Sequence, residues 1–340
     1  MDITTFFAAE FLGQPAAAWA LFMGIVAVLL VLDLGVLNRG DQEIGIRRSL
    51  VLSSFYISVA LLFGAWVWWD LGAESGMLYL TGFVVEKSLA LDNIFVISLI
   101  FAAFAIPRAY QHRVLFWGIL GVLVLRAIMI GLGAALISSF GWILYIFGAF
   151  LIITGIKMLF AGDEPMDLEN SRIIKLVRKV IPVSPTLDGH KFFTHVKQSG
   201  ATKATLVATP LFLALVSIEI ADVVFAVDSV PAVFAITTDP YIVYTSNIFA
   251  VLGLRALYFA LAAMVHRFHY LKYALALVLV LVGSKIFWTH LVGPVNTFFS
   301  LGSTIGILAA GVIVSLWKTR NEDRVAAQAG ASDVSIKRTQ

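Results

Sequence analysis

The sequence predicts an all-α, polytopic membrane protein with about nine transmembrane helices, six of which form two inverted three-helix repeats. Composition is the first observation behind this fold class, because 60% of the 340 residues are hydrophobic and only 13% are charged. The mean hydropathy of +0.93 agrees. The second observation is a series of long apolar runs, and the third is that basic residues fall in alternate loops. Together they exclude an ordinary soluble domain.

The apolar runs, separated by polar loops, give the expected helices in chain order. Each run has at least 18 residues, and about 17 to 25 apolar residues are enough for a transmembrane helix. The runs are residues 17–37, 48–69, 76–106, 113–135, 141–161, 205–236, 241–265, 271–288 and 298–317.

Basic residues in the loops indicate the orientation of the chain. Of the 24 Lys and Arg residues, those outside the apolar runs all fall in alternate loops. The positive-inside rule therefore predicts that the N-terminus lies outside and the C-terminus in the cytoplasm. Membrane lipids are the expected surroundings. No basic stripe of the kind that binds nucleic acid is present in the sequence.

The loop between the fifth and sixth runs contains Arg172–Ile181, in which apolar residues recur at helical spacing with bases between them. This pattern suits a basic amphipathic helix on the inner leaflet, and equally a positive-inside loop that happens to be helical. In an accessory protein it could be a docking surface for a protein partner. The polar tail is expected to be disordered. The expected segments are spans one and two (1–75), repeat one (76–161), the cytoplasmic loop (162–204), repeat two (205–290), span nine (291–317) and the tail (318–340).

An internal repeat relates spans three to five to spans six to eight. The offset stays nearly constant over the three pairs of spans. Because each unit has an odd number of spans, the second copy must enter the membrane from the opposite side. Inverted repeats are typical of transporters, whose substrate site lies near the midplane where the halves meet, although a pore or a structural protein could share one. The aligned polar pairs are Asp92 with Asp222, Arg126 with Arg255 and Lys157 with Lys285.

Acidic residues inside these spans predict the functional site, because carboxylates at membrane depth are costly and usually face an ion path. Glu219 and Asp222 share one helix face. Asp228 would point elsewhere in a regular helix. However, Pro231 has no N–H for the carbonyl of Val227, so we expect the helix to kink or open and turn Asp228 inward.

The donor set favours a hard divalent cation such as Mg²⁺, Ca²⁺ or Mn²⁺, which bind oxygen. The chain has no cysteine, and its six histidines lie in loops or at span ends. These features argue against a midplane zinc site, a haem or a redox enzyme. We expect no enzyme activity and no cofactor beyond the transported ion. The expected ligands are Glu86, Asp92, Asn93, Glu219, Asp222, Asp228 and Asn247.

Five basic residues within the spans would balance these acids. The two arginines lie deep in their spans and are expected to brace carboxylates when no cation is bound. Two of the lysines lie near span ends and can extend to the interface. The third lysine follows Glu86 directly. The expected charge-balancing residues are Lys87, Arg126, Arg255, Lys157 and Lys285.

At Glu86–Phe95, Asp222–Pro240 and Tyr244–Phe259 the chain resembles the TerC family of integral membrane proteins. The similarity covers nearly all of residues 15–318 and is strongest to the Alx-type branch. The resemblance implies export of Mn²⁺, whereas other members are linked to tellurite resistance or to loading secreted enzymes with manganese. Asn93 aligns with Val223, so the two half-sites are not chemically equivalent.

The resulting prediction is Mn²⁺ export by alternating access, with proton antiport as a hypothesis for its coupling. Two alternatives remain open. One is an accessory or scaffold protein for metal delivery or tellurite resistance. The other is a Ca²⁺ transporter on the same fold. Transport of Mn²⁺ by the purified protein would separate the first alternative from an exporter.

Overall fold

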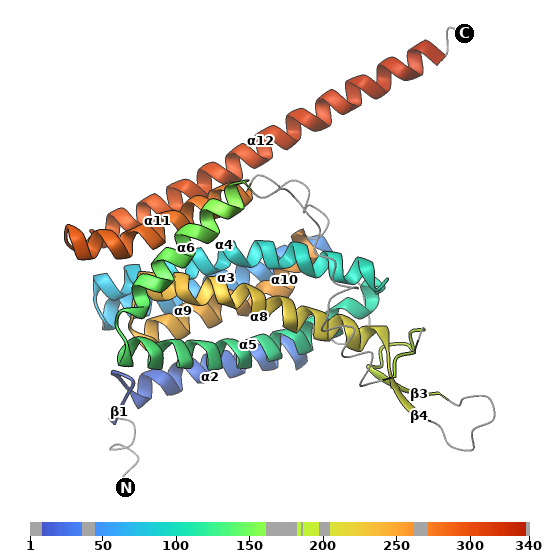
Figure 1. Cartoon of the computed structure of the whole chain (residues 1–340). Helices are drawn as coiled ribbons and strands as arrows, with labels where there is room; N and C mark the ends of the chain where they lie inside the picture. Colours follow the sequence, from blue (N-terminus) through green and yellow to red (C-terminus); the bar gives the residue numbers. More distant parts are fainter. Residues whose placement is uncertain are drawn as a thin grey trace.

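Helices dominate the computed structural model (Figure 1). Seven described helical segments are long and apolar enough to cross a membrane, which confirms an all-α polytopic membrane protein. The description covers residues 9–35, 45–160, 182–184, 186–196, 205–261 and 271–337, without the side chains of 33–35, 91–92 and 320–337.

A helix lies in each of the predicted apolar runs. α2 and α4 are not among the seven segments; α4 is a continuous helix of 31 residues whose sequence includes Glu86, Lys87 and Asp92. The helices are α2 (Ala16–Gly35), α3 (Ile46–Asp70), α4 (Ala73–Ala103), α5 (Arg108–Ser139), α6 (Ile143–Phe160), α8 (Pro210–Ile236), α9 (Pro240–Leu252), α10 (Leu254–Leu261), α11 (Leu271–Leu291) and α12 (Thr297–Lys337).

Two short antiparallel hairpins depart from the purely helical prediction. One pairs β1 (Glu10–Phe11) with β2 (Gln14–Pro15), and the other pairs β3 (Phe193–Val196) with β4 (Thr205–Ala208). The start of the sixth predicted span is therefore a strand. The helix begins at Pro210 because proline suits the first turn, where its missing N–H leaves no hydrogen bond unmade.

The C-terminal tail also differs from the prediction. α12 continues to Lys337 instead of ending near residue 317. Its extension contains Glu, Arg, Gln and several Ala residues, which favour helix. The predicted amphipathic segment at 172–181 lies outside the described residues.

The expected opening of the helix near Pro231 is wrong. α8 runs from Pro210 to Ile236 with Pro231 inside it. A helix interruption lies instead at Gly253, between α9 and α10. α9 has a well-defined start, because the carboxylate of Asp239 accepts from the backbone N–H groups of Tyr241 and Ile242 at 2.8 and 3.3 Å.

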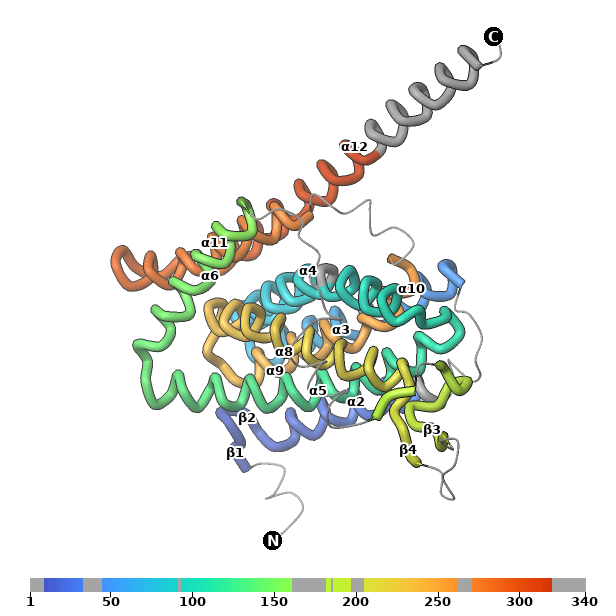
Figure 2. The backbone as a smooth tube through the Cα atoms, turned by 45° about the vertical axis from the view of Figure 1, so that its right-hand side comes forward, coloured from blue at the N-terminus to red at the C-terminus, as the bar shows by residue number. Residues whose placement is uncertain are grey.

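The arrangement places α8 and α9 between α4 and α5 in both views (Figures 1 and 2). α4 packs on α9 and on α8, and α5 packs on α8 and on α9. α6, α11 and α12 form a layer on one side, in which α11 contacts both of the others. Side chains from four helices therefore meet in the centre of the body.

Small residues allow α6 and α11 to approach closely. A Cβ atom at Gly155 would lie 2.6 Å from the carbonyl oxygen of Ala276, and one at Gly283 would lie 2.7 Å from that of Gly148. The later position on α6 thus meets the earlier one on α11, so the two helices run antiparallel. Glycine and alanine at such contacts are typical of helix packing in membranes.

Candidate functional site: a buried arginine and carboxylate cluster

Arg126 on α5 lies at the centre of the buried polar residues. Its side chain is 1% exposed and that of Glu86 on α4 is 0% exposed, so water does not screen either charge. α4 lies close to α9 here. Glycine at position 82 allows this approach, since a Cβ at Gly82 would lie 2.8 Å from Oγ of Ser246. Helix packing therefore brings residues distant in sequence to one point.

The Arg126 guanidinium contacts four oxygen atoms. Its Nη1 donates to Oε1 of Glu86 in a short ion pair. The same nitrogen donates to Oδ1 of Asn247 at 2.9 Å and to Oγ of Ser229 at 3.3 Å. Nη2 lies 3.4 Å from Oδ1 of Asp222. Two carboxylates, an amide and a hydroxyl from α4, α8 and α9 thus surround one positive charge.

A further hydrogen bond holds the Glu86 carboxylate in place. Nδ2 of Asn247 donates to its Oε2 at 3.1 Å, and the Ser229 side chain lies close to the same carboxylate. Asn247 therefore donates to Glu86 and accepts from Arg126. The network brings the predicted residues Glu86, Asp222 and Asn247 together around Arg126.

The hydrogen bonding of the cluster is nevertheless incomplete. Oδ2 of Asp222 and Nε of Arg126 are both buried and have no hydrogen-bond partner in the described part of the chain. Oε2 of Glu219, one turn before Asp222 on α8, is also buried and has no hydrogen-bond partner in the described part of the chain. Unsatisfied buried polar atoms are uncommon in folded proteins and often mark functional sites.

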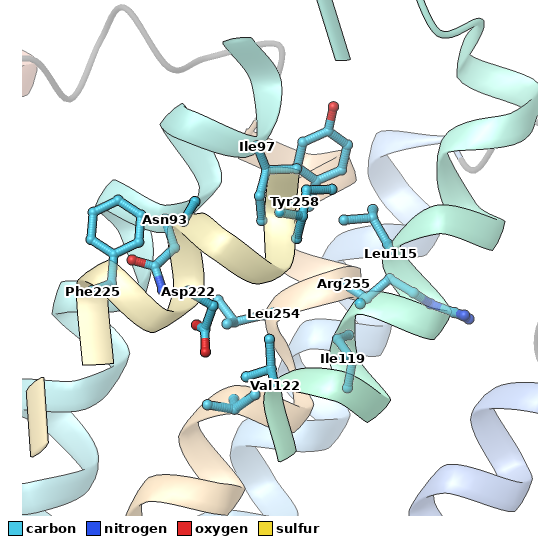
Figure 3. A pocket seen from close by; sticks show the side chains of 14 residues that line it. Asn93, Ile97, Leu115, Ile119, Val122, Asp222, Phe225, Leu254, Arg255 and Tyr258 are labelled. Carbon is cyan, nitrogen blue, oxygen red and sulfur yellow. The ribbon is translucent and has the colours of Figure 1, made fainter. Parts of the chain in front are cut away.

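A cavity of about 30 Å³ adjoins the cluster, with room for one or two water molecules. Its lining includes Asn93, Asp222 and Arg255, among mostly apolar side chains. Figure 3 shows the Asn93 amide and the Asp222 carboxylate on one side, whereas the guanidinium of Arg255 extends away from Asp222. Asp222 thus belongs both to the Arg126 cluster and to the cavity.

Glu219 packs against α5 at a glycine. A Cβ at Gly121 would overlap the Glu219 carboxyl group, so this position accepts the carboxylate because it has no side chain. Glu219 is half-buried. Its carboxyl group lies beside the helix backbone and shares a face of α8 with Asp222, as the spacing predicts.

Asp228 makes its contact elsewhere. It lies beside Thr154 on α6, and the cluster atoms around Arg126 do not include it. The reason is helical phase, because α8 is not opened at Pro231. Ser229, which lies two turns after Asp222 on the same face, faces the cluster instead.

Lys87 does not act as the expected partner of Glu86. Its Nζ donates to the carbonyl oxygen of Ala250 at 3.0 Å. A Cβ at Gly253 would lie 2.8 Å from the same Nζ. Lys87 therefore sits at the C-terminal end of α9, where a positive charge complements the helix dipole. This contact places it at the break between α9 and α10.

The remaining predicted residues are less informative. Lys157 is exposed on α6 and Lys285 is half-buried on α11. Asp92 lies within α4, but its side chain is outside the described ones. Among the described side chains, no group of three or more His, Cys, Asp or Glu could hold a metal ion. Arg126 occupies the centre of the oxygen cluster.

Sequence reasoning missed Ser229, Thr154 and Gly121. For Ser229 a signal existed, since it follows Asp222 by seven residues and so shares its helix face. Thr154 and Gly121 gave no such signal, because their roles depend on which helices become neighbours.

Comparison with known proteins identifies the family. A model of the TerC family of integral membrane proteins matches residues 71–323. An uncharacterized membrane protein of Rickettsia bellii is 47% identical over 307 residues, covering 90% of this chain and 99% of that protein. One from Myxococcus xanthus is 47% identical, covering 91% and 94%.

A third relative carries a functional name. A protein of Escherichia coli strain K12, provisionally named membrane-bound redox modulator Alx, is 42% identical over 318 residues, covering 90% of this chain and 96% of that protein. No solved structure matches the chain. The extent of these matches shows that the chain belongs to the TerC family of integral membrane proteins.

Proposed function

We propose that this protein exports Mn²⁺ across the bacterial cytoplasmic membrane by alternating access. The observation that carries the proposal is the set of four oxygens around Arg126, from Glu86, Asp222, Asn247 and Ser229. Two carboxylates with neutral oxygens are the donors that hard divalent cations prefer. Residues alone reach this class of ion, and the family resemblance narrows it to Mn²⁺.

The ion would bind where Asp222 joins the cluster to the cavity. Oδ2 of Asp222 is buried and unpartnered among the described residues, and it adjoins the cavity with Asn93. Room for one or two waters suits an ion that keeps part of its hydration shell. Glu86 and Asn247 complete the inner group. Asp92, Glu219 and Asp228 are proposed to extend the ion path.

The helix packing supports an inverted-repeat transporter with nine spans. In this proposal α2 and α4 cross the membrane in addition to the seven segments that meet the length and composition criteria. α6 and α11 are the aligned third helices of the two repeats. Their antiparallel contact, with Gly155 against Ala276 and Gly148 against Gly283, is the one expected of inverted copies.

Export needs an energy source. Moving a divalent cation outward against the membrane potential costs about 4.6 kcal/mol per 100 mV, twice the cost of a single charge. We propose that protons supply it, because a carboxylate that has released Mn²⁺ can bind a proton and avoid an uncompensated buried charge. Glu219 is suited to this step, since its Oε2 lacks a hydrogen-bond partner among the described residues.

The test is Mn²⁺ flux through the purified protein in liposomes. Wild type should move Mn²⁺ unaided, and Asp222→Asn and Glu86→Gln should abolish flux. Glu74→Gln, which changes an exposed acid in the first turn of α4, is the matched control. Absence of flux in correctly folded wild type would refute export and favour an accessory protein.

Two further measurements resolve the identity and coupling of the ion. Competition by Ca²⁺ at similar concentrations would favour a Ca²⁺ transporter on the same fold. A trapped pH dye should change as Mn²⁺ moves, and flux with an unchanged dye would refute proton antiport. The name of the Escherichia coli relative points to redox chemistry, but this chain has no cysteine for thiol exchange.

A further inference from the structure

The positive charge of Arg126 occupies the place that a transported cation would need. Its two terminal nitrogens reach both carboxylates of the cluster, Glu86 and Asp222. We propose that Arg126 is an internal competitor of the transported ion, a tethered cation that the ion displaces on binding and that returns to expel it. This inference rests on the proposed function and deepens it, because it names the group responsible for release.

Electrostatics supports displacement. With both carboxylates ionised, Glu86, Asp222 and Arg126 carry a net charge of one negative unit. A divalent ion would reverse this sign while Arg126 remained at the same oxygens. Because the groups are buried, repulsion between the ion and the guanidinium is weakly screened. Arg126 would therefore leave at least one carboxylate when the ion binds.

Electrostatics also supports return. If the ion left and nothing replaced it, two buried carboxylates would remain without a counter-charge, which is strongly unfavourable. Arg126 lowers the free energy of the empty site, because it neutralises Glu86 directly and Asp222 at 3.4 Å. The ion is then released by competition, and its affinity stays moderate.

The incomplete hydrogen bonding of the cluster fits an exchangeable pair. A permanent buried ion pair is expected to satisfy all of its polar atoms. Here Nε of Arg126 and Oδ2 of Asp222 are both buried without partners in the described part of the chain. Only the terminal nitrogens hold the guanidinium. A cation that binds the carboxylates more strongly could therefore displace it.

The experiment compares Mn²⁺ affinity with Mn²⁺ flux in the full-length protein. Arg126→Gln should bind Mn²⁺ at least about tenfold more tightly than wild type and transport it at least about tenfold more slowly. Arg126→Lys should fall between the two. The control is Arg108→Gln, an exposed arginine at the start of α5. Binding by folded Arg126→Gln that is equal to or weaker than wild type would overturn the inference.

A second measurement uses wild type, in case Arg126→Gln does not fold. Infrared difference spectra on adding and removing Mn²⁺ should show a reversible shift of a guanidinium stretching band, and Arg126→Lys should lack it. Mn²⁺ binding without such a shift would overturn the inference. Wild type that neither binds nor transports Mn²⁺ would instead refute the proposed function, so the two failures are distinguishable.

Discussion

The amide nitrogen of Asn247 donates to Oε2 of Glu86 at 3.1 Å, across 161 residues of sequence. This bond joins α9 to α4. The same Asn247 accepts from Arg126 through its Oδ1 at 2.9 Å. A shift of the Arg126 side chain would therefore alter the hydrogen bonds of both the Asn247 amide and the Glu86 carboxylate.

Glu86→Gln should destabilise the protein more than Asp222→Asn. The Glu86 carboxylate is fully buried and is paired with both Arg126 and Asn247, whereas Asp222 lies 3.4 Å from Arg126 and its Oδ2 has no partner in the described part of the chain. Removing one partner of a buried ion pair costs about 3–5 kcal/mol in free energy of unfolding. Thermal unfolding in detergent measures the order, with Glu74→Gln as control. A larger loss for Asp222→Asn would contradict the assignment of Glu86 as the main partner.

Gly121→Ala should impair ion transport with little loss of stability. The new Cβ would overlap the Glu219 carboxyl group, and this flexible side chain can rotate away at small cost. Alanine also favours helix over glycine by about 1 kcal/mol. The transport rate should therefore fall while the thermal midpoint stays nearly unchanged. Gly306→Ala, where the Cβ would meet open space, is the control. Full transport activity in Gly121→Ala would place Glu219 outside the ion path.

The sequence predicted which charged residues lie in the site better than it predicted which residues they contact. Arg126 is a base deep in a long apolar run, so pairing with buried acids was the expected outcome, and the structure places Glu86 and Asp222 beside it. Asp228 depended on an opening at Pro231 that α8 does not show. A proline predicts a lost hydrogen bond, but packing around the helix decides whether the helix opens.

The break between α9 and α10 shows a second limit. Gly253 lies within a continuous apolar run, and nothing in its neighbours distinguishes it from other helical glycines. Its break is stabilised by Lys87, a residue from a helix far away in sequence, which binds the carbonyl of Ala250. The adjacent Glu86 suggested a local ion pair for this lysine, and tertiary packing gave it a backbone partner instead.

Lys87→Met should weaken the end of α9 independently of Glu86. The change keeps the length of the side chain but leaves the Ala250 carbonyl without its donor, at a cost of about 1–3 kcal/mol. A double-mutant cycle with Glu86→Gln checks independence, and the coupling energy should stay below about 0.5 kcal/mol. Lys157→Met, at an exposed lysine, is the control for stability. A coupling energy well above this value would show that Lys87 and Glu86 interact, as their adjacency in the sequence suggested.

Gly155→Ala should destabilise the contact of α6 with α11. The added Cβ would lie 2.6 Å from the backbone oxygen of Ala276, which has no flexible end to move away. Overpacking of this kind costs about 1–3 kcal/mol. The thermal midpoint should fall, whereas Gly302→Ala, with nothing within 4 Å, should leave it unchanged. An unchanged midpoint in Gly155→Ala would show that the two helices are less closely packed.

The absence of cysteine allows the orientation to be tested by labelling, because each introduced cysteine is unique. Lys191 lies between α6 and α8 with a side chain that is 61% exposed, and Gly141 lies exposed between α5 and α6. The positive-inside rule predicts that Lys191→Cys faces the cytoplasm and Gly141→Cys the outside.

A membrane-impermeant maleimide applied to intact cells should therefore label Gly141→Cys and spare Lys191→Cys. Inverted vesicles should give the opposite result. Equal labelling of both variants from one side would mean that α6 does not cross the membrane. In the proposed architecture α6 is the last helix of the first repeat, so that outcome would also remove the odd number of spans on which the inverted relation depends.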